Sequence, residues 1–240
     1  MSNNIQYKAT YTENIDASRV VSTFLTKVFT WMFMALGISA ATAYYFASSP
    51  ALMAYLINEN GLSIGGWIVM LSPLLIVLAF GTMVQKMSAR AAGLLFAFYA
   101  IIMGVSLSFI FLSYTSGSIF KSFFSAAIMF GLMAFAGYTT RKDLSKFGSL
   151  LFMALIGIII ASLVNVFMNS AGLDYIISIA GILIFTGLTA YDVQKLKRIA
   201  LLHSEESETK TKWIIIGALT LYLDFINLFL FLLRFFGNRN

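Results

Sequence analysis

The sequence predicts an all-α polytopic membrane protein that crosses the bilayer seven times. Of its 240 residues 60% are apolar and 11% are charged, whereas soluble domains carry about 25% charged residues. Seven apolar stretches approach the roughly 20 residues that a helix needs to span a bilayer. A bilayer offers unpaired backbone groups no partner, and the alternation of barrel strands is absent, so each stretch is predicted to be a helix. The predicted spans cover residues 24–47, 66–84, 93–113, 121–138, 149–169, 175–193 and 213–236.

These spans leave little chain for a separate soluble domain. We expect a single transmembrane domain over residues 24–236, preceded by a cytoplasmic segment over 1–23 and followed by a short tail over 237–240. The chain has no cysteine, which excludes disulfides, thiolate metal sites and cysteine nucleophiles. The sequence therefore predicts one helical bundle and no cofactor.

The basic residues are distributed unevenly over the predicted connections. Lys8 and Arg19 of the N-terminal segment, with Lys27 at the start of the first span, make three. The second, fourth and sixth connections hold two, three and five, so 13 of the 16 lie on one side. Because cytoplasmic loops carry an excess of Lys and Arg, we expect the N-terminus inside and the C-terminus outside. The same residues are spread over four short segments instead of one patch, which argues against nucleic-acid binding.

Two acidic residues fall within predicted spans, whereas the other eight lie in tails or connections. Asp224 follows Trp213, a residue typical of the interface, by 11 positions. That spacing corresponds to about 16 Å along a helix, in a hydrocarbon core about 30 Å thick. A carboxylate at such depth costs roughly 2.5 to 3.5 kcal/mol on insertion scales, so it needs a partner or a water-filled cavity. Asp224 is therefore the strongest functional candidate.

The last predicted helix carries a narrow polar stripe. Gly217, Thr220, Asp224 and Asn227 fall within an arc of about 80° on a surface otherwise rich in Leu and Phe. This stripe is expected to face other helices. Two interpretations of Asp224 stay open: a functional acid, or a protonated acid that hydrogen-bonds a neighbouring helix and holds the bundle together.

The second acid, Asp192, ends the sixth predicted span. An acid at a helix C-terminus opposes the helix dipole, and an ion pair with Lys195 three residues later is the simplest offset. If Asp192 met Asp224, the two carboxyl groups would share a proton and could offer oxygen ligands to a hard cation. Asp192 is expected near the inner interface and Asp224 near the midplane, so contact requires a tilted helix or a shifted boundary.

Small residues recur where helices could approach one another closely. Gly131 with Gly137, Gly181 with Gly187, and Gly187 with Ala190 are the candidate packing faces. The alternative is that glycine is simply tolerated at these positions of membrane helices.

Three stretches of the sequence are distinctive in combination. They read GYTTRKDLS over 137–145, FTGLTAYDVQKLK over 185–197, and GALTLYLDFINLF over 217–229 with a continuation to Gly237. Together they resemble the Bax inhibitor-1 family, also called the transmembrane Bax inhibitor motif family, and in particular its bacterial branch. The likeness covers nearly the whole chain, which implies residence in the bacterial cytoplasmic (inner) membrane.

The resemblance implies a specific fold and function. In this family the seventh helix is central, the other six surround it, and members act as pH-sensitive calcium leaks. The family pattern pairs Asp192 with Asp224, as proton sensors and as groups that contact the passing Ca²⁺. By the same resemblance, the polar stripe with Thr220 and Asn227 would line the cation path. Calcium is then the transported ion, and no cofactor is implied.

The sequence departs from this pattern at the inner end of the second span. Some bacterial members place an arginine there as a latch for an aspartate, where this chain has Gly81-Thr82-Met83. Lys86 and Arg90 are the candidates to replace that arginine.

Two other functions compete with a leak. Intramembrane aspartyl proteases also use two membrane aspartates, and Tyr191-Asp192 matches half of their signature. Asp224 lacks the Gly-x-Gly that precedes the second acid, and neither of the two prolines supplies the Pro-Ala-Leu motif. We therefore expect no enzyme. A non-transporting interaction protein, which regulates a membrane protease or a stress or cell-death pathway, remains the alternative, and such a protein need not keep the carboxyl pair.

Overall fold

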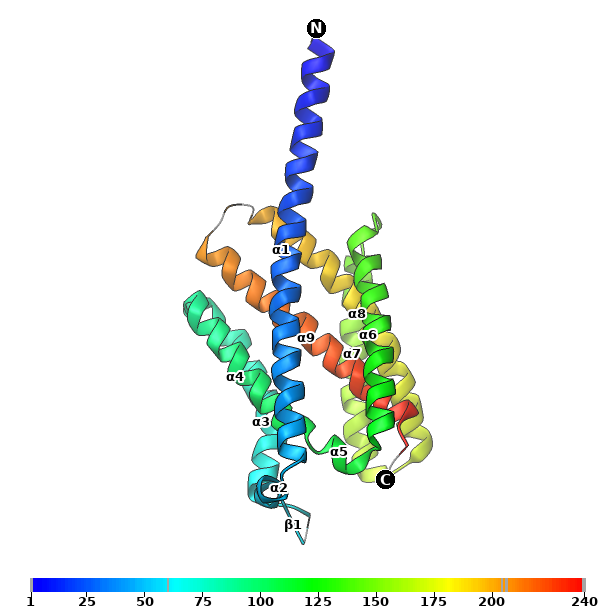
Figure 1. Ribbon diagram of the computed structural model, residues 1–240. Coiled ribbons are helices and arrows are strands. Elements are labelled where there is room, and N and C mark those ends of the chain that lie inside the picture. The colour runs from blue at the N-terminus through cyan, green and yellow to red at the C-terminus, as the bar shows by residue number, and fades with distance from the viewer. Residues whose placement is uncertain (1, 60, 204, 206, 239–240) are drawn as a thin grey trace.

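The computed structural model describes residues 2–59, 61–203, 205 and 207–238, of which 2–16 are described by their backbone alone. Long helices form a bundle, and an antiparallel hairpin of two short strands, with two residues each, lies at one end (Figure 1). The elements in chain order are α1 (Ser2–Ala47), α2 (Pro50–Leu56), β1 (Ile57–Asn58), β2 (Gly61–Leu62), α3 (Ile64–Met83), the 3-10 helix η1 (Val84–Lys86), α4 (Ala89–Leu107), α5 (Ile110–Ser113), α6 (Ser116–Thr139), α7 (Ser145–Met168), α8 (Ala171–Leu202) and α9 (Glu208–Phe236).

Seven helical segments of the described chain are long and apolar enough to cross a membrane, which confirms the predicted fold class. They match the predicted spans in order, with η1 completing the second and α5 completing the third. The first predicted span, 24–47, lies inside α1, which extends without a break back to Ser2. The start of α1, the end of α8 and the start of α9 lie toward one end of the bundle, and the end of α9 lies toward the other (Figure 1).

The sixth span differs most from its predicted range of 175–193. Helix α8 continues to Leu202, so Asp192 lies ten residues before its end and not at the inner end as predicted. The predicted span stopped where charged residues begin. The helix continues because Leu196 and Ala200 keep the spacing of a buried face, with exposed fractions of 4% and 0%.

Proline inside the second span is accommodated by hydroxyl groups. Pro73 lies within α3 and lacks the N–H that would bond the carbonyl oxygen of Val69. The hydroxyl groups of Ser72 and Ser106 donate to that oxygen instead, at 3.0 and 2.6 Å. Since Ser106 belongs to α4, the proline also ties α3 to its neighbour.

Helix α9 is the centre of the bundle. In its most apolar stretch 67% of the residues are buried, against 11% in α7. It packs directly on α1, α4, α6 and α8, whereas α3 packs mainly on α4, and α7 mainly on α8. Figure 1 shows α9 running obliquely between these helices. This confirms the central position that the resemblance implied and adds that four of the six other spans form its direct wall.

The glycines of α6 and α8 pack differently from the predicted pairs. A Cβ atom on Gly137 would lie 2.2 Å from the carbonyl oxygen of Ala190, so α6 and α8 touch backbone to backbone there. Gly181 and Gly187 face the side chains of Phe231 and Leu151. Gly131 meets open space. Its predicted partnership with Gly137 is therefore wrong, because the two residues face different surroundings.

The close approach at Gly137 predicts a clear stability difference between two similar substitutions. Gly137→Ala should lower the free energy of unfolding by about 1 to 3 kcal/mol, because the new methyl group would press on backbone. Gly131→Ala, on the same helix, should be neutral or slightly stabilising, since alanine favours helix by about 0.5 to 1 kcal/mol. Thermal unfolding midpoints of the two detergent-solubilised variants measure the difference. Equal midpoints would contradict the packing.

Candidate ion and proton site

The two predicted acids meet between α8 and α9. Asp192 is 8% exposed and Asp224 is 5% exposed. Their carboxyl groups are close enough to interact directly. Two ionised carboxylates can only accept hydrogen bonds, so a hydrogen bond between these two groups would require one shared proton. The structure thus brings together the two residues that the resemblance paired and that spacing alone left apart.

The longer α8 and the oblique α9 remove the predicted difference in depth. Asp192 lies ten residues, or about 15 Å, from the end of α8 at Leu202. Asp224 lies 16 residues, or about 24 Å, from the start of α9 at Glu208. Because α9 crosses the bundle obliquely, its rise along the bundle axis is shorter than its length (Figure 1). Asp192 therefore lies well inside the bundle.

Few neighbouring groups stabilise the buried carboxyl groups of the pair by hydrogen bonding or by positive charge. No donor in the described part of the chain reaches the Oδ2 atom of Asp224, which is fully buried. Lys195 interacts with Asp192 through its charge alone. Its side chain is exposed, and its Nζ atom lies 6.0 Å from the centre of the Tyr191 ring. The predicted ion pair between Asp192 and Lys195 does not form among the described residues. A buried oxygen without a donor favours a proton or a cation beside it.

The other residues of the predicted stripe are partly engaged within their own helix. Thr220 Oγ1 donates to the Ile216 carbonyl oxygen at 3.0 Å, and Asn227 Nδ2 donates to that of Leu223 at 2.8 Å. Both side chains are half-buried on α9. Gly217 is buried against Leu196 of α8. Thr220 and Asn227 keep oxygen atoms that can accept a bond or contact a cation, and their role in a cation path stays a prediction.

The sequence reasoning missed a hydrogen-bond chain beside the pair. Ser39 of α1 donates to the Ala100 carbonyl oxygen at 2.7 Å, and its Oγ atom lies 2.7 Å from the hydroxyl oxygen of Tyr222. The Tyr222 ring meets the rings of Phe96 and Tyr99 edge-on, at 5.7 and 5.9 Å. This chain fixes α9 to α1 and α4 two residues before Asp224. In the sequence, Tyr222 belongs to the distinctive stretch over 217–229, but nothing there indicates the partner of its hydroxyl group.

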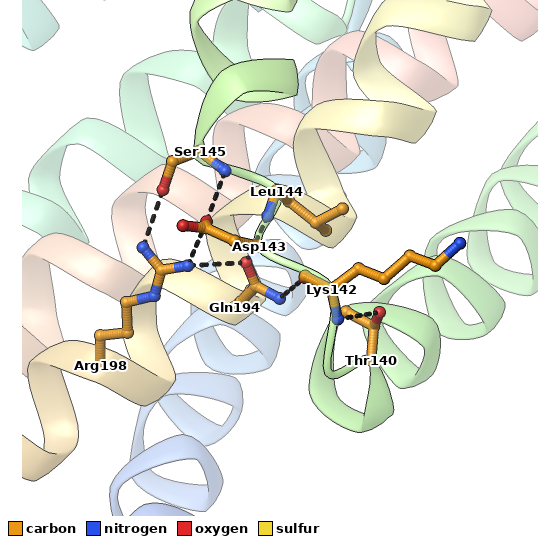
Figure 2. Close-up of polar contacts among 7 residues, drawn as sticks. All are labelled: Thr140, Lys142, Asp143, Leu144, Ser145, Gln194 and Arg198. Atoms are coloured by element: carbon orange, nitrogen blue, oxygen red, sulfur yellow. Dashed lines mark hydrogen bonds and ion pairs between the residues drawn. The ribbon is translucent and has the colours of Figure 1, made fainter.

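A polar clamp holds the connection between α6 and α7 against α8 (Figure 2). Gln194, two residues after Asp192, accepts from the Leu144 amide at 2.8 Å and donates to the Lys142 carbonyl oxygen at 2.8 Å. One turn later, Arg198 donates to Asp143 at 2.5 Å and to Gln194 at 3.1 Å. The clamp therefore fixes the α8 segment that carries Asp192, and it joins two of the three distinctive stretches of the sequence.

A second ion pair lies at the opposite end of the same helices. Asp174, near the start of α8, pairs with Arg234, near the end of α9. Asn165 of α7 donates to Asp174 at 3.5 Å and accepts from the Ser170 amide at 3.1 Å. These residues line a polar pocket of about 530 Å³ at the end of the bundle.

The candidates for an arginine latch lie away from the pair. Met83, at the end of α3, has an exposed fraction of 52%. Lys86 and Arg90 are also exposed, and neither forms an ion pair with the two acids among the described residues. In the described chain, arginine side chains bridge instead at the two ends of α8, where Arg198 and Arg234 hold acids outside the pair.

The fold and the pair of Asp192 and Asp224 define a polytopic helical membrane protein with two carboxyl groups buried inside its bundle. Residues 21–240 match the family described as "Inhibitor of apoptosis-promoting Bax1". The chain belongs to this family, which confirms the resemblance found in its motifs.

Several bacterial proteins are similar over almost their whole length. The inner membrane protein YbhL of Escherichia coli strain K12 is 45% identical over 220 residues, which cover 91% of this chain and 93% of that protein. An uncharacterized protein of Borreliella burgdorferi is 46% identical over 216 residues, covering 90% and 92%. One from Rickettsia prowazekii is 42% identical over 216 residues, covering 90% and 89%.

The clamp predicts how the protection of backbone amides in the α6–α7 connection depends on Arg198 and on pH. Hydrogen bonding from the Arg198 guanidinium holds the pKa of Asp143 well below its usual range. A lowered pKa means that the contact is complete above the ordinary carboxyl range near about 4 and is lost only as the pH falls through the lowered value. Hydrogen-exchange protection of the Leu144 and Ser145 amides should therefore stay constant above about pH 5.

The variant Arg198→Gln should lower the protection of these two amides about twofold to fivefold, the size of effect expected for a solvent-exposed ion pair. Arg141→Gln changes an exposed residue of the same connection and serves as the matched control. Equal protection in both variants would show that Arg198 does not hold the loop.

Proposed function

We propose that this protein is a pH-sensitive cation leak of the bacterial inner membrane, with Ca²⁺ as the transported ion, and not an enzyme. The observation that carries the proposal is the contact between Asp192 and Asp224, two buried acids that interact directly inside the bundle. The inner-membrane location is supported by the name of the Escherichia coli relative and by the seven spans.

The proposed gate is the shared proton. With one proton on the pair, the two carboxyl groups bond to each other and hold α8 against α9. When that proton leaves, two negative charges face each other at low dielectric, where their repulsion at 4 Å is about 4 kcal/mol even at an effective dielectric constant of 20. Separation of the helices or entry of a cation relieves this repulsion. We therefore expect cation flux to rise as the pH rises.

The described residues fit transient contact with Ca²⁺ better than a resident site. Ca²⁺ takes six to eight oxygen ligands, whereas the described chain has no group of three or more His, Cys, Asp or Glu side chains that could hold a metal. Two carboxyl groups, followed along α9 by the oxygens of Thr220 and Asn227, would bind a passing cation weakly. The polar pocket beside Asp174 is a suitable mouth at the far end of α9.

The flux prediction can be tested in calcium-free liposomes that contain a calcium dye, with external Ca²⁺ added at several pH values. Wild-type flux should be higher at about pH 8 than at about pH 5, because the repulsion between the two carboxylates appears only when the shared proton leaves. In the double variant Asp192→Asn, Asp224→Asn, flux at the upper pH should fall about tenfold, equal to about 1.4 kcal/mol. Its pH dependence should also disappear.

Glu205→Gln removes an exposed acid of the α8–α9 connection and is the matched control. Wild-type flux in the double variant would refute the role of the pair. A folded, monodisperse wild-type protein with no flux at any pH would instead favour the interaction protein as the function.

The orientation that we propose, with the N-terminus inside, rests on the 13 of 16 basic residues on one side. The cysteine-free chain allows a direct test with single cysteines. A membrane-impermeant maleimide should label Glu59→Cys, in the hairpin, on intact cells. It should label Lys142→Cys, in the α6–α7 connection, only after permeabilisation. The reverse pattern would invert the topology.

A further inference from the structure

An apolar groove runs between α1 and α6 and has a volume of about 680 Å³. One wall includes Thr26 and Phe33 of α1, the other includes Gly131 and Tyr138 of α6, and Val193 of α8 forms part of the floor. The groove opens outward between two membrane-spanning helices. It is separate from the interface of α8 and α9 where the two acids meet.

The groove has the depth of one membrane leaflet. On α1 it extends from Ser22 to Phe33, which is 11 residues or about 16 Å of helix. The hydrocarbon core of a bilayer is about 30 Å thick, so the groove covers about half of it. Both walls belong to membrane spans, and the medium that surrounds such spans is lipid. An acyl chain therefore matches the groove in length, polarity and access.

Basic groups gather at the end of the groove marked by Ser22 and Tyr138. The ammonium group of Lys197 donates to the Tyr138 carbonyl oxygen and lies 5.1 Å from the centre of its ring. Arg19 precedes Ser22 by three residues and so lies one turn beyond the groove on the same face of α1. The nearby acid, Asp143, is already paired with Arg198. The mouth thus presents positive charge where a lipid phosphate would lie.

We propose that this groove binds an anionic phospholipid, with one acyl chain between α1 and α6 and the phosphate against Lys197 and Arg19. The bound chain would pack on Val193, the residue after Asp192, and on Phe130. The ring of Phe130 meets that of Phe225, the residue after Asp224, at 5.6 Å. The lipid would therefore contact the neighbour of Asp192 directly and the neighbour of Asp224 only through Phe130, without touching the acids themselves.

The experiment uses the full-length protein in liposomes of phosphatidylethanolamine and phosphatidylglycerol, with a trace of phosphatidylglycerol that carries a photoreactive diazirine in its acyl chain. After illumination, mass spectrometry maps the labelled residues. We expect labelling to concentrate on residues 22–33 of α1 and 127–138 of α6. Uniform labelling of all lipid-facing helices would overturn the proposal, as would cross-links to a second copy of the chain in this groove.

A groove-filling variant separates a site from general lipid contact. Gly131→Leu places a side chain in the groove, and a Cβ atom there meets nothing within 4 Å, so the fold is preserved. Its labelling should fall about tenfold, the factor expected for roughly two buried methylene groups. Gly157→Leu, at an equally open position on α7, is the matched control and should label as wild type. Equal labelling of both variants would overturn the proposal.

The headgroup is tested with a second probe of the same acyl chain on phosphatidylcholine. The wild-type groove should label more strongly with the phosphatidylglycerol probe. The double variant Arg19→Gln, Lys197→Gln should lose this preference, whereas Lys146→Gln, an exposed lysine on the same side, should keep it. Equal labelling by both probes in the wild type would overturn the anionic specificity. Because the readout is cross-linking and not flux, its result is independent of the proposed leak.

Discussion

The contact between Asp192 and Asp224 constrains the whole arrangement of the bundle. Each carboxyl group would cost roughly 2.5 to 3.5 kcal/mol or more if it faced lipid alone. Each is therefore enclosed by other helices, and the enclosure of Asp224 requires α9 to lie at the centre, with α1, α4, α6 and α8 around it. The outer helices α3 and α7 hold neither acid of the pair, and most of their apolar surface faces the bilayer. One acidic contact thus accounts for which helix is inside.

Polar contacts hold α8 on both sides of Asp192. At one end Arg198 and Gln194 clamp it to the α6–α7 connection, and at the other Asp174 pairs with Arg234 of α9. These contacts join groups of opposite charge or ordinary donors and acceptors. Between them, the contact of α8 with α9 includes two groups of the same charge. A change in the protonation of the pair would act between these contacts, and the pair of Asp174 with Arg234 would still join α8 to α9.

The fold could be predicted from sequence because bilayer thickness and backbone pairing leave few alternatives to seven helices. The meeting of the acids could not, because hydropathy ends the sixth span at the charged residues near Lys195, whereas burial of Leu196 and Ala200 prolongs the helix. The clamp on Asp143 was equally hidden, because its partner Arg198 lies 55 residues away. Such contacts depend on how helices are placed in space, and periodicity along one helix carries no information about that.

The alternative role of Asp224, to hold the bundle together, can be compared with that of the neighbouring hydrogen bond between Tyr222 and Ser39. A structural polar contact is best made between a neutral donor and an acceptor, as Tyr222 and Ser39 do one half-turn earlier on α9. That chain already joins α9 to α1 and α4. Pairing an acid with a second acid adds a contact that exists only while a proton is shared, which is a poor choice for strength alone. Its distinctive property is that it can be switched, and a switch is what a pH-gated leak requires.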